Sequence, residues 1–146
     1  MLDALASADV VLHAGDVVSK AAWAELQALA HPAPVLAVLG NNDHELVGVL
    51  ATELVTELAG VRVAMVHDSG PTAGREARLH RRFPGADLVI FGHSHAPVDA
   101  GGLGGQRLFN PGSPTQRRAQ PAHSFGWLQL AGGAMVERRI VTIPRP

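Results

Sequence analysis

The sequence predicts an α/β fold in one domain covering residues 1–146, and three observations support this. Short apolar runs rich in Val, Ile and Leu recur along the chain, as in buried strands. The early runs alternate with segments of helical spacing, whereas the later ones follow one another directly. The 146 residues are 47% hydrophobic and 17% charged, which suits a globular domain with a real core. We therefore expect two packed sheets of mixed type with helices outside.

The first part of the chain is expected to alternate strand and helix. Residues 9–13 form a β-branched run that we interpret as a buried strand. Ser19 can cap a helix that continues to about Leu29, before the proline-rich segment 31–34 ends it. Residues 35–39 are a second apolar strand.

The rest of the chain adds strands and one more helix. A hairpin is expected around Ala59-Gly60, and a helix capped by Thr72 is expected to reach about Phe83. A last hairpin should turn at Gly132-Gly133. The strands expected in this part are 53–58, 61–66, 87–91, 106–109, 124–130 and 135–143.

Polar side chains follow four of the apolar strands at the point where each strand ends. Glycine lets the backbone turn sharply there, and loops from neighbouring strands converge beyond the carboxyl ends. Carboxylate oxygen, amide oxygen and imidazole nitrogen together suit a divalent ion such as Mn, Fe, Zn or Ni. The segments are Gly15-Asp16, Gly40-Asn41-Asn42-Asp43, His67-Asp68 and Gly92-His93-Ser94-His95.

Each of these segments alone also has a structural explanation. Gly-Asp is common in turns, and Asn tolerates the left-handed backbone of a turn. A single His can be a hydrogen-bonded residue at a strand end. The four segments in this order, each after an apolar strand, favour a metal centre over these alternatives.

This order of motifs resembles the signature of the calcineurin-like metallophosphoesterase superfamily. Asn110-Pro111-Gly112-Ser113 narrows the resemblance to its small branch, typified by YfcE-type phosphodiesterases. The resemblance implies an αββα sandwich, in which two mixed β-sheets are flanked by helices. It also implies two adjacent divalent ions, with Mn²⁺ the first expectation and Fe, Zn or Ni as alternatives.

The resemblance also implies roles for individual residues. Asp16 would bridge both ions, and His95 would bind the first ion. The second ion would be bound by Asn41, His67 and His93. Asp16, Asn41 and His93 would then carry catalysis, with a metal-bound hydroxide attacking the phosphorus of a small phosphoester substrate.

The sequence departs from the family pattern at its beginning. The family opens with a strand ending in Asp-x-His, and no such motif occurs here before Asp16. Residues 1–5 instead resemble the helix that follows that strand, so we expect the first strand to be missing. Asp9 and His13 are four residues apart and do not replace the motif. We therefore expect tight binding of one ion at most. A misassigned start codon is our preferred explanation; a truncated chain and a degenerate protein are the alternatives.

Other polar residues near the motifs have smaller expected roles. Asn42 stands where many members have a His that acts as an acid, and Asn cannot supply a proton by ionising, which favours substrates with good leaving groups. Asp68 either caps its own turn, which we prefer, or supports a ligand histidine. The remaining expectations are that Asp43 orients its loop or the His67 ring, that His13 is a hydrogen-bonded interior residue, and that Asn110 and Ser113 shape a turn near the site.

Composition excludes several other classes. A net charge of −1 gives no basic field for nucleic acid, and Arg75, Arg78, Arg81 and Arg82 are interpreted as a solvated helix face. No apolar run is long enough for a membrane span, and the absence of Cys fits a cytoplasmic location. Unpaired strand edges could be covered in a homo-oligomer. The alternative function is a catalytically weak or inactive scaffold for protein interaction, similar to the small retromer subunit.

Overall fold

A mixed sheet of five strands forms the centre of the molecule in the computed structural model, which describes residues 2–144. Strands β4 and β5 and strands β5 and β7 pair in parallel, whereas β3 and β6 are antiparallel to their neighbours. The spatial order is β3 (Glu53–Leu58), β4 (Val61–Val66), β5 (Leu88–Phe91), β7 (Arg107–Asn110) and β6 (Val98–Gly101).

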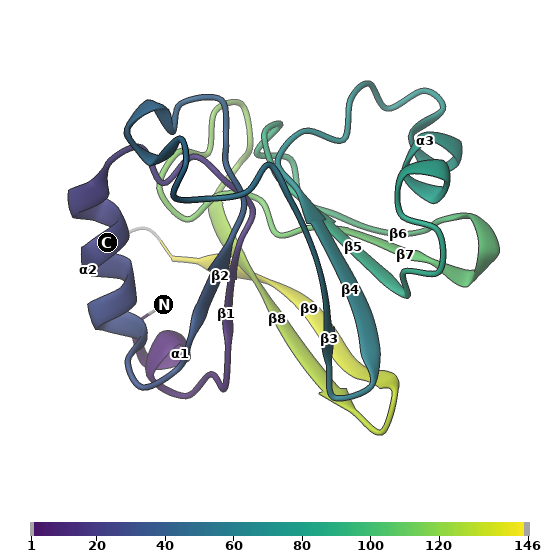
Figure 1. Ribbon diagram of the computed structural model, residues 1–146, viewed down its shortest axis with the longest axis horizontal. Helices are drawn as coiled ribbons and strands as arrows, with labels where there is room; N and C mark the ends of the chain where they lie inside the picture. Colours follow the sequence, from purple (N-terminus) through teal and green to yellow (C-terminus); the bar gives the residue numbers. More distant parts are fainter. Residues whose placement is uncertain (1, 145–146) are drawn as a thin grey trace.

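Two smaller sheets pack on one face of this central sheet (Figure 1). Strands β1 (Val11–His13) and β2 (Val35–Ala37) pair in parallel, and β8 (His123–Ala131) and β9 (Ala134–Ile143) form an antiparallel hairpin. Both small sheets contribute apolar side chains to one core. Its members include Leu12, Leu36, Leu128 and Ile140 on the small sheets, and Val63, Met65 and Ile90 on the central sheet.

Helix α3 (Arg75–Arg82) covers the opposite face of the central sheet. Leu79 and the following Phe83 pack there against Ala64, Val66 and Phe91. Successive residues of a strand point to opposite faces, so β4 supplies Val63 and Met65 to one core and Ala64 and Val66 to the other.

The remaining helices lie on the outer side of β1 and β2 (Figure 1). Helix α1 spans Leu2–Ala6 and α2 spans Lys20–Ala30. The expected cap of α2 is confirmed, because the Ser19 hydroxyl accepts a hydrogen bond from the backbone N–H of Ala22 at 3.1 Å. Short 3₁₀ turns occur at η1 (His44–Leu46) and η2 (Leu103–Gly105). The resulting layers confirm the α/β sandwich, with its second sheet present as two separate pieces.

The start of α3 was predicted wrongly. The helix begins at Arg75 after Gly74, whose φ is 69°, rather than after a Thr72 cap. The side chain of Arg78 explains this, because its guanidinium donates to the backbone oxygens of Ser69, Pro71 and Ala73 and holds the preceding residues as a loop.

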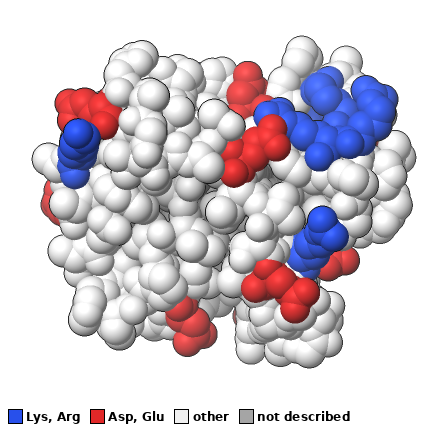
Figure 2. Space-filling view, viewed as in Figure 1, with Lys and Arg blue, Asp and Glu red and all other residues white. Residues whose placement is uncertain are grey.

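The basic cluster on α3 is more engaged than a solvated face. Figure 2 shows the basic side chains of this view gathered mainly over α3. Besides Arg78, the Arg82 guanidinium pairs with Glu53 at 2.5 Å. The Arg75 guanidinium lies 5.0 Å from the centre of the Phe91 ring. The interpretation as a solvated face therefore holds for the exposed Arg81 and Arg82, whereas Arg75 and Arg78 are half-buried.

Strands at the edges of the sheets lack a hydrogen-bonded neighbour on one side within residues 2–144, and β1 and β8 are examples. Strand β1 pairs only with β2, and β8 pairs only with β9. Each therefore has one unpaired edge, as expected from the sequence. Across the same residues, every helix is too short or too polar to cross a bilayer.

Candidate metal centre

Four of the five residues predicted to bind metal come together at one end of the molecule. The loops after β1, β2 and β4 meet at the upper edge of Figure 1. His67 Nε2 lies 3.0 Å from Asn41 Oδ1, 3.2 Å from His93 Nδ1 and 3.5 Å from Asp16 Oδ2. His93 Nδ1 lies 3.0 Å from the same Asn41 oxygen. We call Asp16, Asn41, His67 and His93 the four-residue cluster.

The orientation of the His67 ring is fixed by a hydrogen bond to the backbone. Its Nδ1 lies 2.7 Å from the backbone oxygen of Ala14. A carbonyl oxygen only accepts, so Nδ1 carries the proton and donates, and in the neutral ring Nε2 keeps its lone pair. That lone pair is directed at the cluster. The His93 ring meets the His67 ring edge-on, with centroids 5.1 Å apart.

Asp16 is held by Asn42, a contact that the sequence did not reveal. The Asn42 backbone N–H donates to Asp16 Oδ1 at 3.0 Å, and the Asn42 side-chain amide donates to Asp16 Oδ2 at 2.9 Å. Burial pushes the pKa of Asp16 upward, but these two hydrogen bonds and the nearby His67 and His93 hold the pKa below its usual value. Asp16 is therefore a carboxylate at neutral pH.

Asp43 connects the loops that carry Asp16 and Asn41. Its side chain is 1% exposed and accepts three backbone hydrogen bonds. The donors are the N–H groups of Gly40 at 2.6 Å, Asp16 at 2.9 Å and Val18 at 2.6 Å. The prediction that Asp43 orients its own loop is confirmed. The alternative, that it orients the His67 ring, is wrong, because Ala14 does so.

The backbone around the cluster adopts unusual conformations. Asp16, Val18, His93 and His95 have φ angles of 62°, 82°, 63° and 58°. Val18 is the clearest outlier, since a β-branched residue rarely adopts a positive φ. Its N–H is bound by Asp43, which compensates for this strain. Strained non-glycine residues of this kind concentrate at functional sites.

Two glycines are required because other atoms occupy the space of a side chain. A Cβ atom on Gly40 would lie 2.2 Å from the Asp16 nitrogen and 2.3 Å from Asp16 Oδ1. A Cβ atom on Gly15, whose φ is 93°, would lie 2.5 Å from His67 Nδ1. These glycines allow the loops after β1 and β2 to approach closely.

His95, the fifth predicted ligand, makes its hydrogen bond outside the four-residue cluster. Its Nδ1 hydrogen-bonds to the backbone oxygen of Gln116, and within residues 2–144 it has no hydrogen bond to the four-residue cluster. Burial lowers the pKa of His95, the contact with Gln116 raises it, and the charge of Arg118 lowers it further. His95 is therefore favoured as a neutral imidazole, the form that binds metal.

Asn110 fixes the loop that carries His93 and His95. It is fully buried, and its amide donates to the backbone oxygen of Gly92 at 3.0 Å and to the Ser94 hydroxyl at 3.2 Å. Asn110 Oδ1 accepts from the N–H of Gly112 at 2.9 Å. The Ser113 hydroxyl accepts from the N–H of Gln116 at 3.0 Å. The expectation that Asn110 and Ser113 shape a turn near the site is confirmed.

Two further expectations had different outcomes. The preferred reading of Asp68 is confirmed, since its carboxylate accepts from the N–H of Gly70 at 2.7 Å and caps the turn. His13 is half-buried, and its Nδ1 has no hydrogen-bond partner in the part of the chain described, so the expectation of a hydrogen-bonded interior residue is not met at this atom. Burial lowers the pKa of His13, and the charges of Asp43 and Asp16 act against this.

The chemistry of the cluster fits one divalent ion. Atoms bound to a common ion at about 2.0–2.2 Å lie about 3.0–3.5 Å from one another, which is the range of the contacts to His67 Nε2. Asp16 Oδ2, Asn41 Oδ1 and the lone pair of His67 Nε2 can all be donated to a cation. Among residues 2–144, no three His, Asp or Glu side chains alone have the arrangement of a metal site. An ion here would therefore also need the amide oxygen of Asn41.

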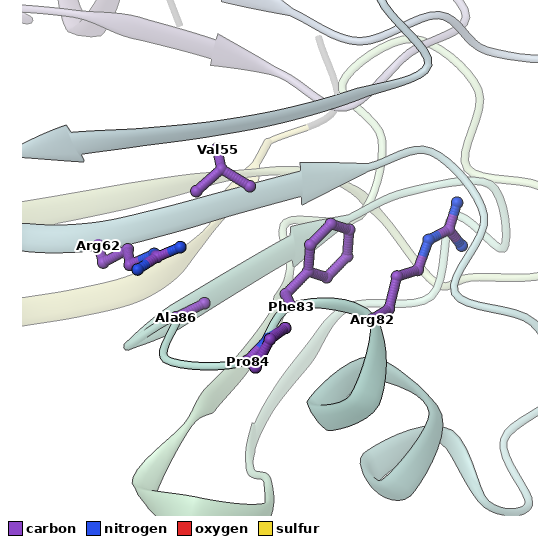
Figure 3. Close-up of a pocket in the computed structure, with 6 residues that line it drawn as sticks. All are labelled: Val55, Arg62, Arg82, Phe83, Pro84 and Ala86. Atoms are coloured by element: carbon purple, nitrogen blue, oxygen red, sulfur yellow. The ribbon is translucent and has the colours of Figure 1, made fainter.

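Two hollows lie away from this cluster. Figure 3 shows the first, a cavity of about 80 Å³ where Val55 and Arg62 of the β3–β4 hairpin lie near Phe83 and Pro84. It is far below the several hundred Å³ of a ligand pocket. The second, of about 370 Å³, is an open hollow between α1 and the β8–β9 hairpin, lined by residues such as Ala4 and Trp127.

Comparisons with known proteins show which family the chain resembles. A family model described as the calcineurin-like phosphoesterase superfamily domain matches residues 1–133. The chain is 34% identical to a probable metallophosphoesterase of Methanothermobacter thermautotrophicus over 120 residues, which are 81% of this chain and 67% of that protein.

Two solved structures share the fold. One is a Vps29 of Entamoeba histolytica in complex with zinc, with a TM-score of 0.75 and 20% identity over 97% of this chain and 86% of that one. The other is an archaeal phosphodiesterase, with a TM-score of 0.73 and 21% identity over 92% of this chain and 82% of that one.

Proposed function

The chain belongs to the calcineurin-like phosphoesterase superfamily, and we propose that it is a metal-dependent phosphoesterase acting on small phosphoesters. The observation that carries this proposal is the convergence of Asn41 Oδ1, His93 Nδ1 and Asp16 Oδ2 on His67 Nε2. A carboxylate, an amide and two imidazoles form a ligand set for a catalytic divalent ion, with Mn²⁺ as the first candidate and Fe, Zn or Ni as alternatives.

The residues of the chain prepare this site for phosphoester hydrolysis. Asp16, His67, His93 and Asn41 would hold the ion. When bound, the ion would supply Lewis-acid activation of water and of the phosphoryl group. Asn42 keeps Asp16 oriented and ionised, and the Ala14 carbonyl keeps His67 Nε2 directed at the site. His95 lies on the same loop as His93 and is the candidate ligand of a second, weaker ion.

The position of Asn42 points to the class of substrate. Its side chain is committed to Asp16, and an amide does not supply a proton by ionising. The leaving group would therefore depart without help from this position. We propose phosphodiesters or phosphomonoesters with good leaving groups, such as aryl esters, as the preferred substrates.

Hydrolysis of bis(p-nitrophenyl) phosphate in the presence of Mn²⁺ tests the proposal. We expect Asp16→Ala and His93→Ala to lower kcat/KM by about 100-fold or more, because each removes a charge or lone pair from the cluster. His44→Ala is the matched control, since His44 directly follows the loop that carries Asn41 but lies on the exposed surface. Activity that is unchanged in both cluster variants would refute the site.

A second candidate function is a catalytically weak or inactive scaffold for protein interaction. Three valines in the loops after β1 and β2 are strongly exposed: Val18 at 56%, Val47 at 67% and Val49 at 55%. Exposed apolar side chains in the loops near a site favour contact with a partner. The unpaired edges of β1 and β8 offer a further route to self-association. Metal binding without hydrolysis of any aryl phosphoester would support this function over the first.

A further inference from the structure

A tight turn between β7 and β8 exposes one of two neighbouring arginines. The N–H of Gln120 donates to the backbone oxygen of Arg117 at 2.9 Å, which closes the turn over residues 117–120. The Arg117 side chain is held within it, because its Nη1 donates to the Gln120 oxygen at 2.7 Å. Arg118 occupies the second position with a φ of 49°, and its residue is exposed.

The Arg118 guanidinium has no acidic partner in the part of the chain described. The ion pairs there involve His67, Arg82, Arg107, Arg138 and Arg139. An arginine with several unused donors is available for an anionic ligand.

The same segment is hydrogen-bonded to His95, the candidate ligand of a second ion. The N–H of Gln116 donates to the Ser113 hydroxyl at 3.0 Å, and the Gln116 oxygen accepts from His95 Nδ1. Arg118 therefore follows, two residues later, a direct contact with His95. The loop lies at the same end of the molecule as the loops after β1 and β2 (Figure 1).

We propose that Arg118 binds a non-bridging phosphoryl oxygen of the substrate at this site, an inference that rests on the proposed phosphoesterase function. A phosphodiester carries one negative charge, and further charge develops on the phosphoryl oxygens during hydrolysis. The planar guanidinium presents paired donors that match a phosphate, which an ammonium group does not. The guanidinium of Arg117 is instead held against the turn by its hydrogen bond to the Gln120 oxygen.

The two arginines form a matched pair for the experiment. Inorganic phosphate is titrated calorimetrically into the Mn²⁺-loaded protein, and its competitive inhibition of bis(p-nitrophenyl) phosphate hydrolysis is measured in parallel. We expect Arg118→Gln to weaken phosphate binding about tenfold or more, as for a lost hydrogen bond to a charged group. Arg118→Lys should recover only part of this, and Arg117→Gln should change phosphate binding less than about threefold.

Two outcomes would overturn the assignment of Arg118. Phosphate binding by Arg118→Gln that matches the wild type would exclude contact with the ligand. Equal weakening by Arg117→Gln and Arg118→Gln would indicate a general effect of loop charge. Phosphate binding that depends on Arg118 in a protein that hydrolyses no phosphoester would support the anion contact while refuting the proposed function.

Discussion

The carboxylate of Asp43 accepts a hydrogen bond from the backbone N–H of Asp16 at 2.9 Å, across 27 residues of sequence. The same carboxylate binds the N–H groups of Gly40 and Val18, so one buried side chain joins the loops after β1 and β2. The four-residue cluster depends on this junction, because Asp16 and Asn41 come from different loops.

Asp43→Asn is expected to destabilise the protein by about 3 kcal/mol or more, because a carboxylate with three charge-assisted hydrogen bonds becomes an amide with one acceptor oxygen. Urea denaturation measures the loss. Asp68→Asn is the matched control, since Asp68 accepts one N–H at an exposed turn, and it should lose less than about 1 kcal/mol. Equal losses in the two variants would contradict the role of Asp43.

Asn42→Ala is expected to weaken Mn²⁺ binding by about 10- to 100-fold, the usual cost of losing a residue that orients a metal ligand. The variant loses the amide contact with Asp16 Oδ2 but keeps the backbone contact with Asp16 Oδ1. Calorimetric titration measures the affinity, with His44→Ala as the unaffected control. An affinity equal to that of the wild type would show that Asn42 does not position Asp16.

Gly40→Ala is expected to impair both folding and metal binding, because its new methyl group would lie 2.2 Å from the Asp16 nitrogen. Gly101→Ala is the control, since a Cβ there meets no atom within 4 Å. Thermal unfolding should show a clear loss of Tm for Gly40→Ala and little change for Gly101→Ala. Similar Tm values for both variants would contradict the close approach of the two loops.

Asp99 joins the central sheet to the β8–β9 hairpin and gives stability that depends on pH. Its carboxylate pairs with Arg107 and, at 2.9 Å, with Arg138. Burial alone would raise the pKa of Asp99. The hydrogen bonds from the two arginines outweigh this effect, so the pKa lies below its usual value. The folded state therefore favours the ionised form, and this stability is present above the unfolded pKa of about 3.9.

Asp99→Asn is accordingly expected to cost about 1 kcal/mol at pH 7. The difference from the wild type should shrink as the pH falls below about 4, toward the lower pKa of the folded state. Urea denaturation at pH 7 and near pH 3 measures this difference in the free energy of unfolding. Asp9→Asn controls for the change in net charge, because Asp9 takes part in no ion pair within residues 2–144. A difference that grows on acidification would contradict the ion-pair assignment.

Local pattern was sufficient for most of the fold. The β3–β4 hairpin was predicted at its observed bounds, because apolar alternation and Ala59-Gly60 both act locally. The start of α3 was not predictable in this way, since the preceding loop is held by Arg78 from within the helix. Strand β6 was missed because the sequence Val-Asp-Ala-Gly has little strand preference and pairs only at the sheet edge beside β7.

The candidate site was predictable as a set of residues but not as a set of contacts. Strand-end motifs indicated Asp16, Asn41, His67 and His93, and the fold brings these together. The supporting roles of Asn42 and Asp43 depend on how two loops meet in space. The sequence carries only a weak sign of them, namely polar residues directly beside Asn41.

Titration of Mn²⁺ into the purified chain tests the central proposal most directly, with Asp16→Ala and His67→Ala measured under the same conditions. We expect one tight site per chain in the wild type, because the four-residue cluster is whole, whereas His95 is hydrogen-bonded to Gln116 rather than to the cluster. We expect that site to be lost in both variants. Two tight sites of equal affinity, or tight binding that survives both substitutions, would contradict a single metal centre built on Asp16 and His67.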